Sequence, residues 1–411
     1  MEPIFNSQLD VDFYKFPMAQ MVFHKYPDVP VRYALTNRTS GVNLADHIRQ
    51  GDVRYELDHV RTLRFGNSDL HYLRGTNEHG MRMFAEDYLD FLRTLQLPPY
   101  DLFVSAGQLK LEFSGRWCEA IYWETIALSI INELYNRSQL NRLSKFAQDL
   151  VYAEGKQRLG KKIIQLRHEA FPVMFSDFGT RRRFSREWQD YVIGVLVEEL
   201  PKNFIGTSNV AFAQKYNIVP MGTSAHELYM AMGAIMEARG RSVKEAQQQV
   251  MQDWWDEFGW GLSIALTDTW GTDFFFEQMT HEQARDWKGL RQDSGDPFAF
   301  GEKALRFYKF HNVDSQGKMI IFSDGLDVAT MIELNKRFRD YIRVSFGWGT
   351  NLTNDLGIPA LSLVVKLIEA MGRGTVKLSD NLAKAVGRAE DIERYKRELG
   401  YTNTFFQNCK Y

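Results

Sequence analysis

The sequence is short of cysteine, of net charge and of long apolar runs, and each shortage excludes a class of protein. Two cysteines, Cys118 and Cys409, cannot form a disulfide framework, and no CxxC pair is available for zinc or redox chemistry. A net charge of −2 lacks the basic excess typical of nucleic-acid-binding proteins. No run of about 18 apolar residues is present, so we expect no membrane span. The N-terminus lacks the pattern of a signal peptide, so we expect a soluble, cytoplasmic protein.

What the chain does have is length and aromatic residues. Its 411 residues are enough for two or three domains, or for one barrel with additions. With 44% hydrophobic and 25% charged residues, the composition is that of a folded globular protein. Nine tryptophans and 29 phenylalanines indicate a large aromatic core, an aromatic-lined pocket, or both.

Residues 1–140 have a mixed pattern that predicts an α+β N-terminal domain. Residues 31–36 have the pattern of a strand, and helical apolar spacing predicts helices at 81–95 and 120–134. The charged segment 138–167 is also predicted to be helical, which extends this domain to about residue 170.

Between residues 171 and 358, short apolar runs end in polar loops and alternate with helical stretches. Strands that alternate with helices indicate a parallel sheet, and about seven in series predict an irregular α/β barrel. The polar loops would then share the barrel face that carries chemistry. A doubly wound open sheet is the alternative. The strand-and-loop units lie at residues 172–177, 203–208, 218–224, 262–268, 289–295, 319–325 and 342–347.

The last residues, 359–411, are predicted to pack back on the N-terminal domain as a strand pair and a helix. Apolar runs at 361–368 and 374–378 predict the strands, with the turn Met371-Gly-Arg-Gly374 between them. The sequence therefore predicts three parts: the N-terminal domain, the barrel core and this C-terminal addition.

Two of the loops have residues suited to a phosphate. Phe346-Gly-Trp-Gly-Thr-Asn351 is a glycine-containing turn after a strand, in which Gly349 lets backbone amides approach a phosphate and Thr350 adds a hydroxyl donor. Ser323-Asp-Gly325 ends the preceding strand in the same way, so Asp324 and Thr350 are expected at one site. The alternative for either loop is a tight structural turn.

The loop of residues 289–296 is denser in functional groups. Arg291 offers a planar fork of donors for phosphate or carboxylate. Asp293 and Asp296 suit ribose hydroxyls or a magnesium shell. The alternative is an Arg–Asp pair on the surface.

A second basic loop, Asp177-Phe-Gly-Thr-Arg-Arg-Arg-Phe184, also follows a strand. One or two of its arginines would neutralise a polyanion such as pyrophosphate, but the sequence does not decide among Arg181, Arg182 and Arg183. Phe178 either stacks on a flat ring or belongs to the core.

His226 stands at the start of a predicted helix, after Gly222-Thr-Ser224. A neutral imidazole at such a place can be a nucleophile or a base. A satisfied structural histidine is the alternative. The fourth residue after His226 is Met230, so the HExxH spacing of a zinc site is absent.

Together these segments resemble the nicotinate phosphoribosyltransferase family, whose motifs they follow in order over nearly the whole chain. Each motif is weak alone, and the match lies in the set. The matching segments are Asp10-Val-Asp12-Phe-Tyr14-Lys15, Asp177-Phe-Gly-Thr-Arg-Arg-Arg-Phe184, Gly206-Thr-Ser-Asn209, Gly222-Thr-Ser-Ala-His226-Glu, Gly289-Leu-Arg-Gln-Asp-Ser-Gly-Asp-Pro297, Phe322-Ser-Asp324, Ser345-Phe-Gly-Trp-Gly-Thr350 and Val376-Lys-Leu-Ser-Asp380.

The resemblance implies a homodimeric enzyme with an irregular α/β barrel and a flanking N-terminal domain. It implies that nicotinate reacts with phosphoribosyl pyrophosphate to give nicotinate mononucleotide and pyrophosphate, the first step of NAD salvage from nicotinate. Hydrolysis of ATP, with Mg²⁺ as cofactor, would be coupled to this reaction.

The resemblance also implies residue roles. His226 matches the histidine that ATP phosphorylates, Arg291 an anion-binding arginine and Asp293 a group for the ribose hydroxyls. The pyridine ring would lie between two aromatic side chains, and the 5'-phosphate against the glycine turn. The substrate-binding residues expected on this basis are Tyr14, Phe178, Arg181, Ser208, Thr223, Asp324, Gly349 and Thr350.

Two positions bear on the substrate and on the limits of the resemblance. Related nicotinamide enzymes have Asp where this chain has Ser208, and an acid there would repel a carboxylate, so nicotinate is favoured. After Asp380 many relatives have Pro-Gly-Lys, whereas this chain has Asn381-Leu-Ala-Lys384, which leaves the roles of Lys377 and Lys384 open. The alternatives are a nicotinamide or quinolinate phosphoribosyltransferase, a phosphosugar lyase or isomerase, and a binding module without activity.

Overall fold

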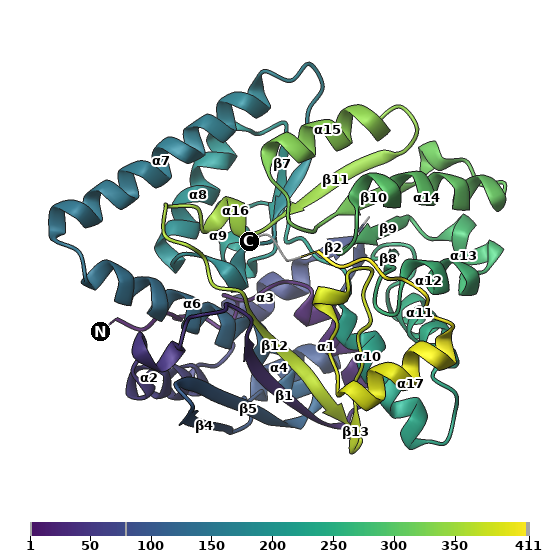
Figure 1. The fold of residues 1–411 in the computed structure, drawn as a ribbon, viewed down its shortest axis with the longest axis horizontal. Coiled ribbons are helices and arrows are strands. Elements are labelled where there is room, and N and C mark those ends of the chain that lie inside the picture. Colours follow the sequence, from purple (N-terminus) through teal and green to yellow (C-terminus); the bar gives the residue numbers. More distant parts are fainter. Residues whose placement is uncertain (1, 79, 408–411) are drawn as a thin grey trace.

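The computed structural model describes residues 2–78 and 80–407, so Cys409 lies outside the described part. Two large sheets organise the chain: a five-stranded antiparallel sheet and a six-stranded parallel sheet. In Figure 1 the antiparallel sheet lies at the bottom and the parallel strands lie above it. One continuous cluster of buried hydrophobic residues contains side chains from both, including the fully buried Trp117, Trp123, Trp254, Trp270 and Trp348.

The antiparallel sheet has the order β13-β12-β1-β5-β4 and joins strands from the two ends of the chain. In β1, Val31, Tyr33 and Leu35 are buried and alternate with more exposed residues, as expected for a strand with one face on the core. This confirms the strand predicted at residues 31–36. The strands are β1 (Pro30–Asn37), β4 (Tyr100–Ser105), β5 (Gln108–Arg116), β12 (Leu363–Ala370) and β13 (Arg373–Gly374).

Three of the helix predictions in the N-terminal part need correction. The helix predicted at 81–95 begins only at Glu86, because Met81–Arg82 pairs with Asn77–Glu78 as the hairpin β2–β3. The helix predicted at 120–134 is divided between α5 and α6, and the helix predicted at 138–167 is interrupted where Ser144 caps α7 through Ala147 N. The helices are α1 (Lys15–Lys25), α2 (Gln50–Thr62), α3 (Asn67–Gly75), α4 (Glu86–Thr94), α5 (Trp117–Ala120), α6 (Trp123–Asn141) and α7 (Lys145–Arg167).

The parallel sheet confirms the predicted α/β class, with six strands in the order β7-β6-β11-β10-β9-β8. The first strand of the series, β6, pairs with the last strand, β11. The strands therefore follow one another in ring order, unlike those of a doubly wound sheet. Within the described residues no ladder joins β7 to β8, so the ring is open there. The strands are β6 (Phe175–Asp177), β7 (Phe204–Thr207), β8 (Ile264–Leu266), β9 (Gly289–Gln292), β10 (Met319–Phe322) and β11 (Arg343–Trp348).

One of the seven predicted strands, at residues 218–224, is not formed as a full strand, so this prediction is wrong. This segment forms a single parallel bridge, between Thr207 and Pro220. Proline has no amide hydrogen to donate, so it interrupts a ladder at this point.

Most helices of this region begin just after a polar strand-end loop, and several are capped by its side chains. Ser185, Asn209, Asp296 and Asp327 each accept a hydrogen bond from the first turn of the following helix. The helices are α8 (Arg186–Glu199), α9 (Val210–Tyr216), α10 (His226–Ala238), α11 (Lys244–Phe258), α12 (Thr272–Gln278), α13 (His281–Asp286), α14 (Pro297–Phe310), α15 (Val328–Phe338), α16 (Thr350–Thr353) and α17 (Ala389–Leu399). No helix in residues 2–78 and 80–407 is long and apolar enough to cross a membrane.

The C-terminal strand pair is only partly as predicted. β12 pairs with β1, but β13 covers Arg373–Gly374 alone, so the strand predicted at 374–378 is wrong. Trp270 Nε1 donates to Val376 O, and Leu378 N donates to Thr269 O. These bonds draw the segment away from the sheet and toward the loop after β8. The residue limits proposed for the three parts stay predictions.

Candidate active site

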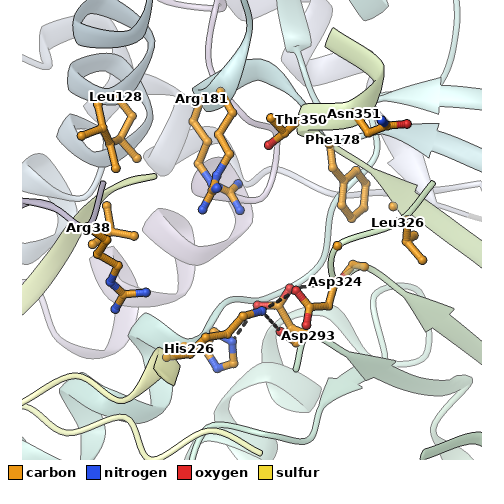
Figure 2. A pocket seen from close by; sticks show the side chains of 18 of the residues that line it. Arg38, Leu128, Phe178, Arg181, His226, Asp293, Asp324, Leu326, Thr350 and Asn351 are labelled. Atoms are coloured by element: carbon orange, nitrogen blue, oxygen red, sulfur yellow. Dashed lines mark hydrogen bonds and ion pairs between the residues drawn. The ribbon is translucent and has the colours of Figure 1, made fainter. Parts of the chain in front are cut away.

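A cavity of about 240 Å³ lies between the carboxyl ends of the parallel strands and the antiparallel sheet (Figure 2). β12 contributes Leu363, Val364 and Lys366 to its wall, and Arg38 follows β1. A smaller cavity of about 50 Å³ shares several lining residues with it, among them Arg181 and His226. Eight of the predicted site residues line the larger cavity: Phe178, Arg181, His226, Arg291, Asp293, Asp324, Gly349 and Thr350.

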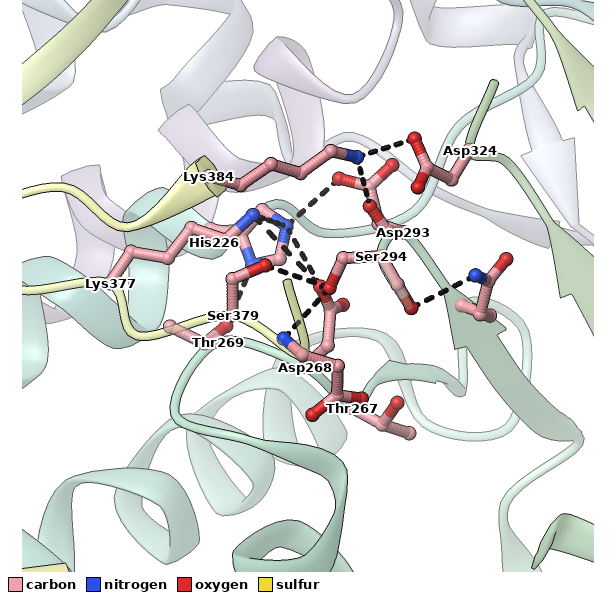
Figure 3. Close-up of polar contacts among 12 residues, drawn as sticks. His226, Thr267, Asp268, Thr269, Asp293, Ser294, Asp324, Lys377, Ser379 and Lys384 are labelled. Carbon is pink, nitrogen blue, oxygen red and sulfur yellow. Dashed lines mark hydrogen bonds and ion pairs between the residues drawn. The ribbon is translucent and has the colours of Figure 1, made fainter. Parts of the chain in front are cut away.

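One end of the cavity, which we call the phosphoryl end, is lined by His226, Asp293, Lys377 and Lys384, and the fully buried Asp268 lies 3.9 Å from Lys377 Nζ. His226 opens α10 and is held from three sides (Figure 3). Its Nδ1 lies 2.9 Å from Thr269 Oγ1, and its Nε2 lies 2.9 Å from both Asp293 Oδ2 and Lys377 Nζ. The imidazole ring is thus held through Nδ1, and Nε2 lies between the carboxylate of Asp293 and the ammonium of Lys377.

Burial, followed by the nearby Lys377 charge, lowers the pKa of His226 to about 4. The imidazole is therefore neutral at pH 7. Burial alone would raise the pKa of Asp293, but its hydrogen bond with His226 and the charges of Arg291 and Lys384 bring it well below 3.8. A neutral imidazole carries one N–H hydrogen. With that hydrogen on Nε2 the ring donates to Asp293 and Nδ1 accepts from Thr269, whereas with it on Nδ1 the ring donates to Thr269 and Nε2 accepts from Lys377. In the second tautomer the Nε2 lone pair can accept a proton or an electrophile.

The two lysines come from the segment after β13. Burial lowers the pKa of Lys377 to about 8, so its ammonium is largely charged at pH 7. Lys384 donates to Asp293 O at 2.7 Å and forms an ion pair with Asp324. These two contacts show where Lys384 lies: it joins the loops that follow β9 and β10 of the parallel sheet.

Arg291 is the penultimate residue of β9 and is anchored within the site. Its Nε donates to Ser323 Oγ at 2.9 Å and its Nη1 donates to Ser224 O at 3.1 Å. Its Nη2 lies 3.5 Å from Asp293 Oδ1. These contacts leave Arg291 on the cavity wall beside the carboxylate of Asp293, where it can bind an anion.

The other end, which we call the aromatic end, consists of Tyr14, Phe178 and Arg181. Phe178 lines the larger cavity and Tyr14 the smaller one, while Arg181 lines both. The Arg181 guanidinium lies 5.8 Å from the centre of the Tyr14 ring, within cation–π range. Phe178 rests on Gly347, where any Cβ would come within 2.4 Å of its ring. Glycine at 347 therefore makes the room that Phe178 needs.

Burial separates the three arginines of residues 181–183 into one that is inside the fold and two on the cavity wall. Arg183 is fully buried and pairs with Asp10 at 2.6 Å, so it supports the fold. Arg181 and Arg182 line the cavity, and Arg181 also lies 3.4 Å from Asp12.

Three residues singled out in the sequence lie outside the lining of both cavities. Ser208 is buried and donates to Asp12 Oδ1 at 2.6 Å. Asp296 caps α14 through Ala299 N. Thr223 lies in the segment before α10, where Gly222 backs closely on the main chain of Tyr14. Ser208 therefore supports the structure next to the cavities through Asp12 and does not line them, and Asp296 supports a helix.

The glycine turn after β11 has a free helix start. The first main-chain bonds of α16 are donated by Leu352 and Thr353 to Gly349 O. The preceding amides, those of Thr350 and Asn351, have no such acceptor within the helix. Both residues line the cavity, so this turn is suited to a phosphate.

His226 is positioned by the residue that follows it. Glu227 accepts hydrogen bonds from Lys15 at 2.7 Å, Tyr33 at 2.6 Å and Trp117 at 2.8 Å. All four side chains are buried. The first turn of α10 is thereby tied to α1, β1 and α5, which fixes His226 relative to the antiparallel sheet.

Sequence reasoning missed several residues that the fold brings here. Asp268 ends a strand unit just as Asp324 does, and that parallel was a usable signal. Thr269, Arg38 and Lys366 had no local pattern that set them apart. Within the described residues no group of three His, Cys, Asp or Glu side chains is arranged to hold a metal ion.

Comparison with known proteins follows the same lines. The sequence model of the nicotinate phosphoribosyltransferase family matches residues 173–403, and the model of that family's N-terminal domain matches residues 9–132. A nicotinate phosphoribosyltransferase from Vibrio cholerae is 33% identical with a TM-score of 0.87, covering 98% of this chain and 95% of its own. One from Porphyromonas gingivalis is 32% identical with a TM-score of 0.86, covering 97% of this chain and 100% of its own.

Proposed function

The chain belongs to the nicotinate phosphoribosyltransferase family, and we propose that it joins nicotinate to phosphoribosyl pyrophosphate, with ATP hydrolysis coupled through a phosphohistidine at His226. The observation that carries the proposal is the placement of His226 Nε2, 2.9 Å from both Asp293 Oδ2 and Lys377 Nζ, on a cavity also lined by Arg291 and Thr350. The proposed products are nicotinate mononucleotide and pyrophosphate.

In the transfer step the pyridine nitrogen attacks C1 of the ribose. The C1–O bond to pyrophosphate breaks, and pyrophosphate leaves with the electron pair. The positive charges of Arg291 and Lys384, both on the cavity wall, stabilise the negative charge that develops on the leaving pyrophosphate. Phe178 and Tyr14 hold the flat ring in line with C1. Gly349 and Thr350 bind the 5'-phosphate, and Asp293 the ribose hydroxyls.

In the coupling step the γ-phosphoryl group of ATP passes to His226 Nε2. The N–P bond forms as the P–O bond to ADP breaks, and ADP leaves with the electron pair. In the tautomer with the hydrogen on Nδ1, the low pKa of His226 keeps Nε2 unprotonated for the attack, and the charged Lys377 neutralises the phosphoryl oxygens. Water later hydrolyses the phosphohistidine to phosphate.

Magnesium fits this site as an ion that enters with the phosphates. Asp293 and Asp324 line the cavity with carboxylate oxygens, and Asp268 has a buried Oδ1 without a hydrogen-bond partner. Two or three hard oxygen ligands completed by substrate oxygens and water suit Mg²⁺, which would withdraw charge from the phosphate groups.

We propose nicotinate as the base because Arg181 is a cation on the walls of both cavities, close to Tyr14. A substrate carboxylate pairs with Arg181, and the neutral Ser208 adds no repulsion. Quinolinate and nicotinamide are the alternatives. A cytoplasmic homodimer that carries out the first step of NAD salvage completes the proposal.

The decisive experiment has two arms. Incubation with ATP labelled at the γ-phosphate is expected to place acid-labile phosphate on His226, identified by peptide mass spectrometry. Phosphoribosyl pyrophosphate offered with each base is expected to give nicotinate mononucleotide fastest. Equal rates with nicotinamide or quinolinate would reject the base assignment, and product without any labelled histidine would reject the coupling.

A further inference from the structure

The segment Lys377 to Lys384, the lysine loop, brings two cations to the phosphoryl end without belonging to either sheet. Lys377 Nζ lies 2.9 Å from His226 Nε2, and Lys384 Nζ lies 2.7 Å from Asp293 O (Figure 3). Within the described residues, the regular structure of the loop is limited to a single antiparallel bridge between Lys377 and Val386 and the short 3₁₀ turn Leu382–Lys384. Its position therefore depends on side-chain and loop contacts, not on a ladder.

The loop contains a residue in an unfavourable conformation. Ser379 has φ +70°, a region that residues other than glycine seldom adopt. It is fully buried, its N–H donates to Thr269 O at 3.2 Å and its Oγ donates to Ser294 Oγ at 2.8 Å. Such a conformation persists only where the surrounding structure holds it.

The segment Tyr401 to Gln407, the C-terminal strap, supplies further contacts to this loop. Four consecutive loop residues, 379–382, each bond to the strap. The bonds are Tyr401 Oη to Ser379 O at 2.5 Å, Asn403 Nδ2 to Asp380 O at 2.8 Å, Asn381 Nδ2 to Gln407 O at 2.8 Å, Gln407 N to Asn381 Oδ1 at 3.0 Å and Leu382 N to Phe405 O at 3.0 Å.

The strap and loop also fit against two glycines of the parallel sheet. A Cβ at Gly271 would come within 3.1 Å of the Tyr401 ring, and a Cβ at Gly295 within 3.1 Å of Asp380 Cβ. Asp380 in turn accepts from Thr272 N at 2.8 Å. The lysine loop is thereby clamped between the strap and the loops that follow β8 and β9.

We propose that the C-terminal strap is a positioning element of the active site: by holding the lysine loop, it sets Lys377 against His226 and Lys384 against Asp293. Tyr401 and Asn403 act through these lysines and do not line either cavity. Asn381, which stands where relatives were expected to have proline, belongs to this device because its side chain bonds to Gln407. The effect on rate rests on the proposed function, whereas the holding of the loop does not.

The first test needs no substrate. In the variant Tyr401→Phe/Asn403→Ala, amide hydrogen exchange in residues 376–385 is expected to rise by about tenfold, since two hydrogen bonds of ordinary strength are lost. Exchange in α10 is expected to stay unchanged. The single Tyr401→Phe variant keeps the ring and gives a smaller rise in the same peptide. Thr402→Ala, in an exposed neighbour with no described partner, is the matched control. Unchanged exchange in the lysine loop overturns the proposal.

The second test separates positioning from general support of the fold. The double variant is expected to lower kcat while the KM for nicotinate stays the same, because the strap reaches the phosphoryl end and not the aromatic end. In a Lys377→Ala/Lys384→Ala background the strap substitutions are expected to cause no further loss. An equal loss in both backgrounds overturns the proposal. If the unaltered protein makes no nicotinate mononucleotide, the proposed function fails, and hydrogen exchange still decides the strap.

Discussion

The two ends of the cavity are built in different ways. At the phosphoryl end, the polar side chains contact one another directly, and His226 Nε2 meets Asp293 and Lys377 at the same distance of 2.9 Å. At the aromatic end, Phe178 lines the larger cavity and Tyr14 the smaller one, and the Tyr14 hydroxyl donates to Glu124. One end is thus a network of charged and polar side chains, and the other presents aromatic surfaces.

This difference shows how one pocket can separate two tasks. Burial and the nearby Lys377 keep His226 neutral, and the hydrogen bond with His226 together with the charges of Arg291 and Lys384 keeps Asp293 ionised, so these charge states are set before any ligand binds. Stacking surfaces need no such preparation, because binding a ring depends on shape and area. Substitutions at the two ends are therefore expected to affect different kinetic constants.

The largest effect is expected from His226→Ala. The variant should take up no phosphate from ATP, and the ATP-stimulated rate should fall by about a thousandfold, within the range for loss of a nucleophile or proton-transfer group. Labelling and steady-state kinetics measure both. His71→Ala, at an exposed histidine, is the control. If ATP still stimulates His226→Ala as it does the unaltered protein, the phosphoryl end has another acceptor.

The acid stability of the protein tests the charge state of the same end. The pKa of His226 is about 4 in the folded chain against 6.5 for the free side chain. The unfolded chain therefore binds the proton first as the pH falls, and stability present above pH 6.5 is lost between 6.5 and 4, by about 3 kcal/mol. Urea unfolding across this range should show a shallower loss for His226→Gln. If the stability of both proteins falls equally steeply with pH, the pKa of His226 is not lowered in the folded chain.

At the aromatic end, Phe178→Ala is expected to raise the KM for nicotinate by about ten- to a hundredfold, the cost of a lost stacking partner. Phosphorylation of His226 should be unchanged, because Phe178 makes no contact with the phosphoryl end other than its position under Arg291. Initial rates at varied nicotinate and a labelling assay measure the two effects. Phe310→Ala, at a ring that is 82% exposed, serves as control. Loss of labelling would show that the two ends are not separable.

The smallest effect is expected from Ser208→Ala. It removes a buried hydrogen bond to Asp12, so the free energy of unfolding should fall by about 1–3 kcal/mol. The burial of Asp12 already raises the pKa of its carboxyl, which limits the charge left unpaired. The preference for nicotinate over nicotinamide should persist, because Ser208 lines neither cavity. A large change in this preference would show that Ser208 contacts the ring directly.

Much of the fold could be predicted because its signals are local. Apolar runs that end in Gly, Ser, Thr and Asp marked six strands of the parallel sheet, and the strand at residues 31–36 was also predicted. The errors arose where partners far away in the chain decide the structure. Residues 375–378 have the composition of a strand, yet Val376 and Leu378 bond to Trp270 and Thr269. At Pro220 the missing amide hydrogen limited a predicted strand to one bridge.

The candidate site divides in the same way. The sequence by itself determined the chemistry of the loops, because Arg291, Asp293 and His226 stand in short motifs whose residue types suit anions and phosphoryl transfer. Only the tertiary structure decided the charge states of those groups and which side chains contact them. The pKa of His226 depends on burial and on Lys377, 151 residues away in the chain. The lysine loop depends on the C-terminal strap, and no local pattern contains contacts made between such distant segments.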